Sequence, residues 1–181
     1  MARGETRFDQ IPGSEGIAEA RDILGGNGGK GGDTLRIGKS VLNSTVFGSN
    51  AGDDVADGAD SISIGSTVDD SFVSGNGGND TLLLGKLVTN SSIAGGAGDD
   101  SISLAGTLIA AKVAGGSGSD TITLTSSQPE LFKASIYGGA NDSGSATGND
   151  SIRLAFTKDI ITSSIVGASG KDTLHVSAGS E

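Results

Sequence analysis

An aspartate that precedes Ser or Thr and then an aliphatic residue recurs along most of this chain. The pattern occurs at Asp33, Asp60, Asp80, Asp100, Asp120, Asp150 and Asp172. Successive aspartates are 20 residues apart between Asp60 and Asp120, and 22 to 30 residues apart elsewhere. The extra residues fall in glycine-rich turns, where stacked coils tolerate insertions. A repeat of this length predicts a solenoid in which each repeat forms one coil.

Aliphatic residues lie two and four positions after each aspartate, as Ile102 and Leu104 follow Asp100. This spacing is typical of a strand with one buried face. A further aliphatic residue at offset eight, and then a small residue alternating with a β-branched one (Ser91 and Ile93), predict a second strand. Coils stacked about 4.8 Å apart would pair each strand with its neighbour. We therefore predict an all-β, right-handed parallel β-solenoid of about seven coils over residues 25–181, with two strands per coil.

The amino-acid composition indicates which side chains form the core and which kinds of binding partner the protein favours. The chain of 181 residues contains 32 glycines, five Phe, one Tyr and no Trp, which favours a core of stacked aliphatic side chains. Its net charge of −10 opposes binding to nucleic acid or anionic lipid and favours cations as small partners. No apolar run approaches the ~18 residues that span a bilayer, so we predict no membrane span. The absence of cysteine excludes disulfides and thiolate metal sites.

The stretches "GNGGND", "GGAGDD" and "GGSGSD" resemble the glycine- and aspartate-rich nonapeptide of RTX proteins, which form a parallel β-roll with calcium between the turns. The resemblance implies that Ca²⁺ is bound here by Asp80, Asp100 and Asp120, with the backbone around Gly75, Gly95 and Gly115. An RTX roll carries the glycine turn on both edges, whereas this chain carries it on one. Calcium would therefore line a single edge. The long repeat also resembles β-strand repeat proteins of bacterial surfaces and phage particles.

A second interpretation of the aspartates needs no ion, because each side chain can accept hydrogen bonds from turn N–H groups. Both interpretations remain open at this point. The adjacent acids Asp99 and Asp100 lie in a glycine turn with no aromatic platform for a sugar, and the lone His175 is expected on the surface. The Ser and Thr residues after the aspartates are expected to form a solvated strand face. We therefore predict no catalytic residues and a protein that is not an enzyme.

Residues 1–24 lack the repeat and are predicted to form a separate N-terminal segment. Ser14 is a candidate helix N-cap, and "GSEGIAEARDIL" predicts a short helix. Phe8 and Ile11 supply apolar groups in polar surroundings. The segment is expected to cap the first coil, to anchor the solenoid to a protein partner, a particle surface or a second copy, or to do both.

The repeats occupy nearly all of residues 25–181, and the sequence shows neither a secretory signal nor the C-terminal secretion region expected of exported RTX proteins. We therefore expect a non-enzymatic structural protein of a phage virion, such as a capsid decoration or fibre protein, attached through residues 1–24. The alternative is a calcium-binding RTX-like module of a secreted bacterial adhesin or extracellular enzyme, located outside the cell or at its surface.

Overall fold

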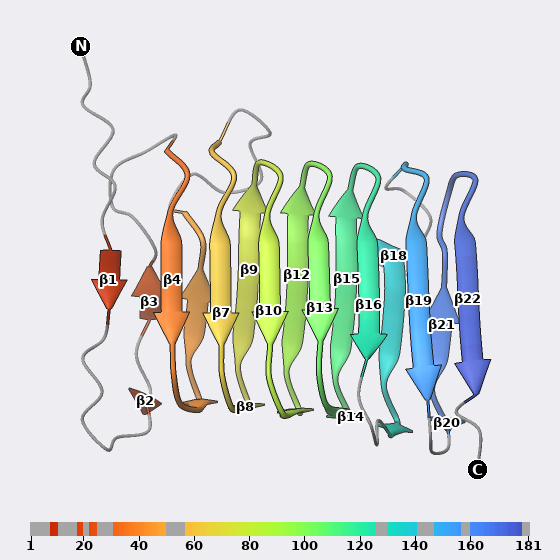
Figure 1. The fold of residues 1–181 in the computed structure, drawn as a ribbon, viewed down its shortest axis with the longest axis horizontal. Coiled ribbons are helices and arrows are strands. Elements are labelled where there is room, and N and C mark those ends of the chain that lie inside the picture. The colour runs from red at the N-terminus through yellow and green to blue at the C-terminus, as the bar shows by residue number, and fades with distance from the viewer. Residues whose placement is uncertain are drawn as a thin grey trace.

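The computed structural model describes residues 8–10, 18–19, 22–24, 31–49, 57–125, 130–140, 147–156 and 160–178. These residues form three parallel sheets that run side by side along one rod, with no helix among them. The strands of the first sheet run down the front of Figure 1, those of the third run up behind them, and the coils progress from left to right. The chain is therefore a right-handed parallel β-solenoid, as the repeat predicts. Over the same residues, no helix is long and apolar enough to cross a membrane.

Each coil contributes one strand to each sheet, except the last described coil, which contributes a strand to the first sheet only. The first sheet contains, in spatial order, β1 (Phe8–Gln10), β4 (Thr34–Ile37), β7 (Ser61–Ile64), β10 (Thr81–Leu84), β13 (Ser101–Leu104), β16 (Thr121–Thr125), β19 (Ser151–Phe156) and β22 (Thr173–Ala178). The second contains β2 (Ala18–Glu19), β5 (Val41–Leu42), β8 (Thr67–Asp69), β11 (Leu87–Thr89), β14 (Thr107–Ile109), β17 (Leu131–Phe132) and β20 (Ile160–Ile161). The third contains β3 (Asp22–Leu24), β6 (Thr45–Phe47), β9 (Phe72–Gly77), β12 (Ser92–Ala97), β15 (Lys112–Ser117), β18 (Ser135–Gly139) and β21 (Ser164–Val166).

The prediction of two strands per coil is wrong, because the segment expected to be one strand bends in its middle. Val88 lies in β11 of the second sheet, whereas Ile93 lies in β12 of the third. Between them Asn90 adopts a left-handed φ of 47°, which turns the chain. A strand of three residues has only one inward side chain. Its alternation of inward and outward residues is therefore too short to be distinguished, in the sequence, from that of the strand that follows.

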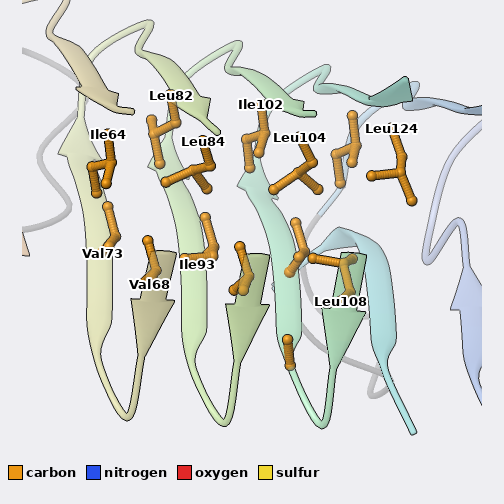
Figure 2. Packing of buried hydrophobic residues seen from close by; sticks show 14 of the residues in the cluster. Ile64, Val68, Val73, Leu82, Leu84, Ile93, Ile102, Leu104, Leu108 and Leu124 are labelled. Atoms are coloured by element: carbon orange, nitrogen blue, oxygen red, sulfur yellow. The ribbon is translucent and has the colours of Figure 1, made fainter. Parts of the chain in front are cut away.

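The core consists of aliphatic columns that run the length of the rod. Ile62, Leu82, Ile102 and Ile122 pair in register along the first sheet, and each is at most 1% exposed. Figure 2 shows the labelled members of this and the neighbouring columns, which point into the space that the sheets enclose. Complete burial of such a side chain stabilises the fold by about 1.5–3 kcal/mol. The inward orientation predicted for the residues two positions after the repeated aspartates is confirmed for all four.

The C-terminal end of the described rod differs from its middle in the burial of its apolar side chains. Leu174 and Val176 of β22 pair with the buried Ile152 and Leu154 of β19 but are 53% and 49% exposed. No described coil covers their outer side. The final coil therefore presents to solvent the side chains that every inner coil buries.

The predicted N-terminal helix is wrong where the structure describes that segment, because Ala18–Glu19 and Asp22–Leu24 are strands. The strands β1, β2 and β3 pair in parallel with β4, β5 and β6. A short isolated helix is marginal in water, whereas the open edge of each sheet offers backbone partners. The candidate cap Ser14 lies outside the described residues. The strands of residues 8–24 thus occupy the position of a first coil at the edge of the solenoid.

Candidate functional site

The glycine turns stack at the corner where the third sheet leads into the first. Each turn ends at one of the repeated aspartates, immediately before a strand of the first sheet, as Asp100 precedes β13. Asp80, Asp100 and Asp120 are only 1–2% exposed. The structure thus gathers the predicted site residues into one file of carboxyl groups, which we call the aspartate column. It comprises Asp33, Asp60, Asp80, Asp100, Asp120, Asp150 and Asp172, of which all but Asp172 are buried.

In six of the seven aspartates of the column, all except Asp33, one carboxyl oxygen accepts a hydrogen bond that joins adjacent coils. The backbone N–H of Asp80 donates to Oδ1 of Asp100 at 2.7 Å, and the N–H of Asp100 donates to Oδ1 of Asp120 at 2.8 Å. The same bond links Asp33 to Asp60, Asp60 to Asp80, Asp120 to Asp150 and Asp150 to Asp172, at 2.7–3.0 Å. The aspartates therefore accept turn N–H groups, as the second interpretation of the sequence predicts.

The other oxygen has no such partner. Oδ2 of Asp60, Asp80, Asp100 and Asp120 is buried and makes no hydrogen bond. A buried carboxylate oxygen without a hydrogen bond is unfavourable, because burial removes its hydration without replacement. Each of these atoms therefore calls for a proton, a cation or an ordered water.

The predicted glycines lie directly against the column. A Cβ atom on Gly95 would lie 2.3 Å from Oδ2 of Asp100 and 2.5 Å from the carbonyl oxygen of Gly115. On Gly115 it would lie 2.4 Å from Oδ2 of Asp120. A Cβ atom on Gly75 would come even closer to the Asp80 carboxyl group. These positions require glycine because the stacked carboxyl group and the next coil fill the space of a side chain.

Burial raises the pKa of the inner carboxyl groups well above their ordinary value. It raises the pKa of Asp60 to about 7, of Asp80 to about 6, of Asp100 to about 8 and of Asp120 to about 7. The N–H bond to Oδ1 acts in the opposite direction, and neighbouring carboxylates raise each pKa further. The column therefore binds protons near neutral pH when no other cation is present.

The donor chemistry of the column is compatible with calcium only in part. Carboxylate Oδ2 atoms and glycine carbonyls are the hard oxygen ligands that Ca²⁺ prefers, but Ca²⁺ takes six to eight of them. Oδ1 is already hydrogen-bonded, and the described residues include no group of three His, Cys, Asp or Glu side chains arranged to hold a metal ion. Calcium binding by Asp80, Asp100 and Asp120 stays a prediction.

A second candidate site lies at the surface, and the sequence analysis did not predict it. At the bend between the second and third sheets, one residue in each of six described coils adopts a left-handed φ of 45–51°. These residues are Asn43, Asp70, Asn90, Ala110, Lys133 and Thr162. In three coils a buried serine follows the bend, namely Ser44, Ser71 and Ser91. Oγ of Ser91 accepts a hydrogen bond from the N–H of Ser71 and donates one to the carbonyl of Thr89. We call this bend, with the residues that line it, the crease.

The crease holds an open groove of about 710 Å³. Its exposed lining includes Asn43, Asp70, Phe72, Asn90, Lys112 and Lys133. A sequence signal for it exists, since an Asp-Ser pair at 70–71 and an Asn-Ser pair at 90–91 are 20 residues apart. The signal disappears in the next coils, where Ala110 and Lys133 take the same position.

In comparisons with protein-family models, curated proteins and solved structures, nothing matches this chain.

Proposed function

We propose that the protein is a non-enzymatic structural rod that displays a surface. This proposal rests on the role of the buried aspartate carboxyl groups, which bind neighbouring coils to one another. The carboxyl groups most shifted in pKa, which elsewhere would suggest an acid or base catalyst, join coil to coil through Oδ1. They also lie 1–3% exposed, out of reach of a substrate. Their role is therefore to hold the repeats in register.

We further propose that the rod is a virion component of the capsid decoration or fibre type, attached through residues 1–24. A regular stack of parallel coils holds its surface away from the point of attachment, and residues 1–24 lack the glycine-aspartate repeat of the rest. Strands β1–β3 place this segment at one end of the stack, which suits an attachment point.

The test is to isolate the protein from its native source and identify what copurifies with it. Copurification with capsid or tail proteins, and a label on the N-terminal segment lying at the particle surface in electron micrographs, are expected. Recovery with the cell envelope, or from the medium together with a dedicated exporter, would contradict the virion assignment. The mass in solution would show whether copies associate.

The orphaned Oδ2 atoms favour one alternative, a calcium-binding RTX-like module of a secreted adhesin or extracellular enzyme. In that case millimolar Ca²⁺ raises the melting temperature relative to chelator, because a ligand that binds only the folded state stabilises it. Asp100→Asn would remove this difference, whereas Asp99→Asn, at the exposed neighbouring position, would retain it. Equal melting curves in Ca²⁺ and chelator would exclude this alternative.

A further inference from the structure

The crease offers hydrogen-bonding groups that the fold does not use. The backbone N–H groups of Asn43, Asp70 and Asn90 donate to carbonyl groups of the next coil. Their side chains are exposed and make no hydrogen bond within the described part of the chain. An amide presents both a donor and an acceptor, and a carboxylate presents acceptors only. These three side chains can therefore bind a partner rich in groups that both donate and accept.

The geometry of the crease suits an extended partner. Asn43, Asp70 and Asn90 occupy the same position in consecutive coils, and Lys112 and Lys133 continue the groove into the next two. At the 4.8 Å spacing of paired strands, five coils extend over roughly 19 Å. The groove is open along this length, so it lacks the enclosure typical of a site for a compact small molecule. A linear polymer lying parallel to the rod axis would meet a polar group at every coil.

Aromatic rings hold the other functional groups of the groove in place. Phe72 is 36% exposed, and its ring packs edge-on against Phe47 with the centroids 5.7 Å apart. The Lys112 ammonium lies 5.4 Å from the centre of the Tyr137 ring. The Lys133 ammonium lies 5.2 Å from the centre of the neighbouring Phe132 ring. Contacts of this kind limit the movement of the ammonium groups while their N–H donors stay available.

The charged side chains of the groove indicate which kind of linear polymer it can bind. Lys112 and Lys133 give one end of the groove two positive charges, whereas Asp70 places a negative charge near the other. A densely charged polyanion such as nucleic acid would meet this carboxylate and the net charge of −10. A polymer with occasional carboxylates and many hydroxyls meets neither obstacle to the same extent.

We propose that the crease binds a linear polysaccharide that carries carboxylate groups, with its chain parallel to the axis of the solenoid. Sugar hydroxyls would donate to and accept from Asn43 and Asn90, the C–H face of one sugar ring would lie on Phe72, and a carboxylate would pair with the two lysines. This inference goes beyond the proposed function, since it holds for a rod in a particle or on a cell.

The experiment measures binding to the full chain by calorimetry and by NMR shifts, with three probes: hexagalacturonate, cellohexaose and hexaglutamate. Hexagalacturonate is expected to bind most tightly and to shift the amide signals of residues in the crease. The double variant Lys112→Ala/Lys133→Ala should weaken its binding about ten-fold, the equivalent of about 1.4 kcal/mol. Binding of cellohexaose should change little, because a neutral sugar has no carboxylate for the lysines.

The matched control is Lys39→Ala/Lys86→Ala, which removes the same charge from exposed positions outside the groove. It should leave hexagalacturonate binding unchanged, and melting curves will show that both double variants fold. Three results would overturn the proposal: no binding of hexagalacturonate, equal weakening by the control variant, or preferential binding of hexaglutamate, which would assign the crease to an acidic peptide.

Discussion

The corner formed by the stacked glycine turns, which we call the glycine corner, and the crease both turn the chain from one sheet to the next, but they join adjacent coils through different side chains. Both corners turn the chain, and at both a side chain accepts an N–H bond from the preceding coil, through Oδ1 of Asp100 at one and Oγ of Ser91 at the other. The hydroxyl also donates its proton to the carbonyl of Thr89, so it is fully satisfied. The carboxyl group keeps a second buried oxygen without a partner. A ladder of carboxyl groups is therefore sensitive to pH and cations, whereas a ladder of hydroxyls is not.

The largest effect should appear when a glycine at the stacked glycine turns is replaced. Gly95→Ala would press its Cβ against Asp100 and the backbone of Gly115, and we expect a loss of about 3 kcal/mol in the free energy of unfolding. Gly38→Ala is the matched control, because a Cβ there meets nothing within 4 Å. Urea denaturation measures both. Similar midpoints for the two variants would show that the glycine corner can relax.

A change of pH should affect the aspartate column next most strongly. The folded pKa of Asp100 is raised to about 8 from the ordinary 3.8, so between these values the folded state holds more protons than the unfolded state. This contribution to stability is fully present below pH 4 and is lost as the pH rises through 8. We expect a lower melting temperature at pH 8.5 than at pH 5 in chelator, by about 2–4 °C for each kcal/mol lost.

The substitution Asp100→Asn separates this effect from other titrations. Its amide oxygen can still accept the N–H of Asp80, and its NH₂ group replaces the protonated oxygen. The variant should depend less on pH and exceed the wild type in stability at pH 8.5. A wild-type melting temperature that rises from pH 5 to pH 8.5 would indicate an ionised column and would contradict the proton-binding account.

A smaller effect on stability is expected from extending the series of hydrogen bonds that joins the serines of adjacent coils at the crease. The N–H groups of Ser44 and Ser71 donate to the serine of the next coil, but Ala111 interrupts the series after Ser91. Ala111→Ser would supply an acceptor for the Ser91 N–H and should stabilise the protein by about 1 kcal/mol. Thermal unfolding against Ala105→Ser, at an exposed position, tests this. Destabilisation by Ala111→Ser would mean that the bend there has no room for a hydroxyl.

The smallest effect concerns the left-handed residue of the bend. Ala110 has a φ of 49°, a region in which Asn is more easily accommodated than Ala, and Asn90 takes this position in the preceding coil. Ala110→Asn should therefore add about 0.5 kcal/mol of stability. A chemical denaturation series with Ala110→Val, which should destabilise, measures the preference. Equal stability of the Asn and Val variants would show that backbone conformation has little influence here.

The sequence predicts the first sheet and the aspartate column because two independent patterns coincide there. Alternation places Ile102 inward, and the constant offset from Asp100 places it in register with Leu82. The third sheet could not be separated from the second, because β11 and β14 contain a single inward residue each. The N-terminal strands escaped prediction because their main interaction is with an edge elsewhere in the chain.

The crease was missed for a different physical reason. A left-handed bend is recognisable where Asn or Asp occupies it, but Lys133 and Thr162 give no local turn signal. There the stacked coils on either side impose the conformation. The groove residues Phe72 and Lys112 become neighbours of the bend only once three strands per coil are established.

Because the central coils pair in the same register, mutation can change the length of the rod by whole coils. Residues 61–80, 81–100 and 101–120 each contact the coil before and the coil after through the same residue classes, from the aliphatic columns to the aspartate column. Loss of residues 81–100 would bring Ile62 against Ile102 and Asp80 against Asp120, pairs of the same kind as those removed. Unequal recombination between repeats can thus lengthen or shorten this protein one coil at a time, without a new interface having to evolve.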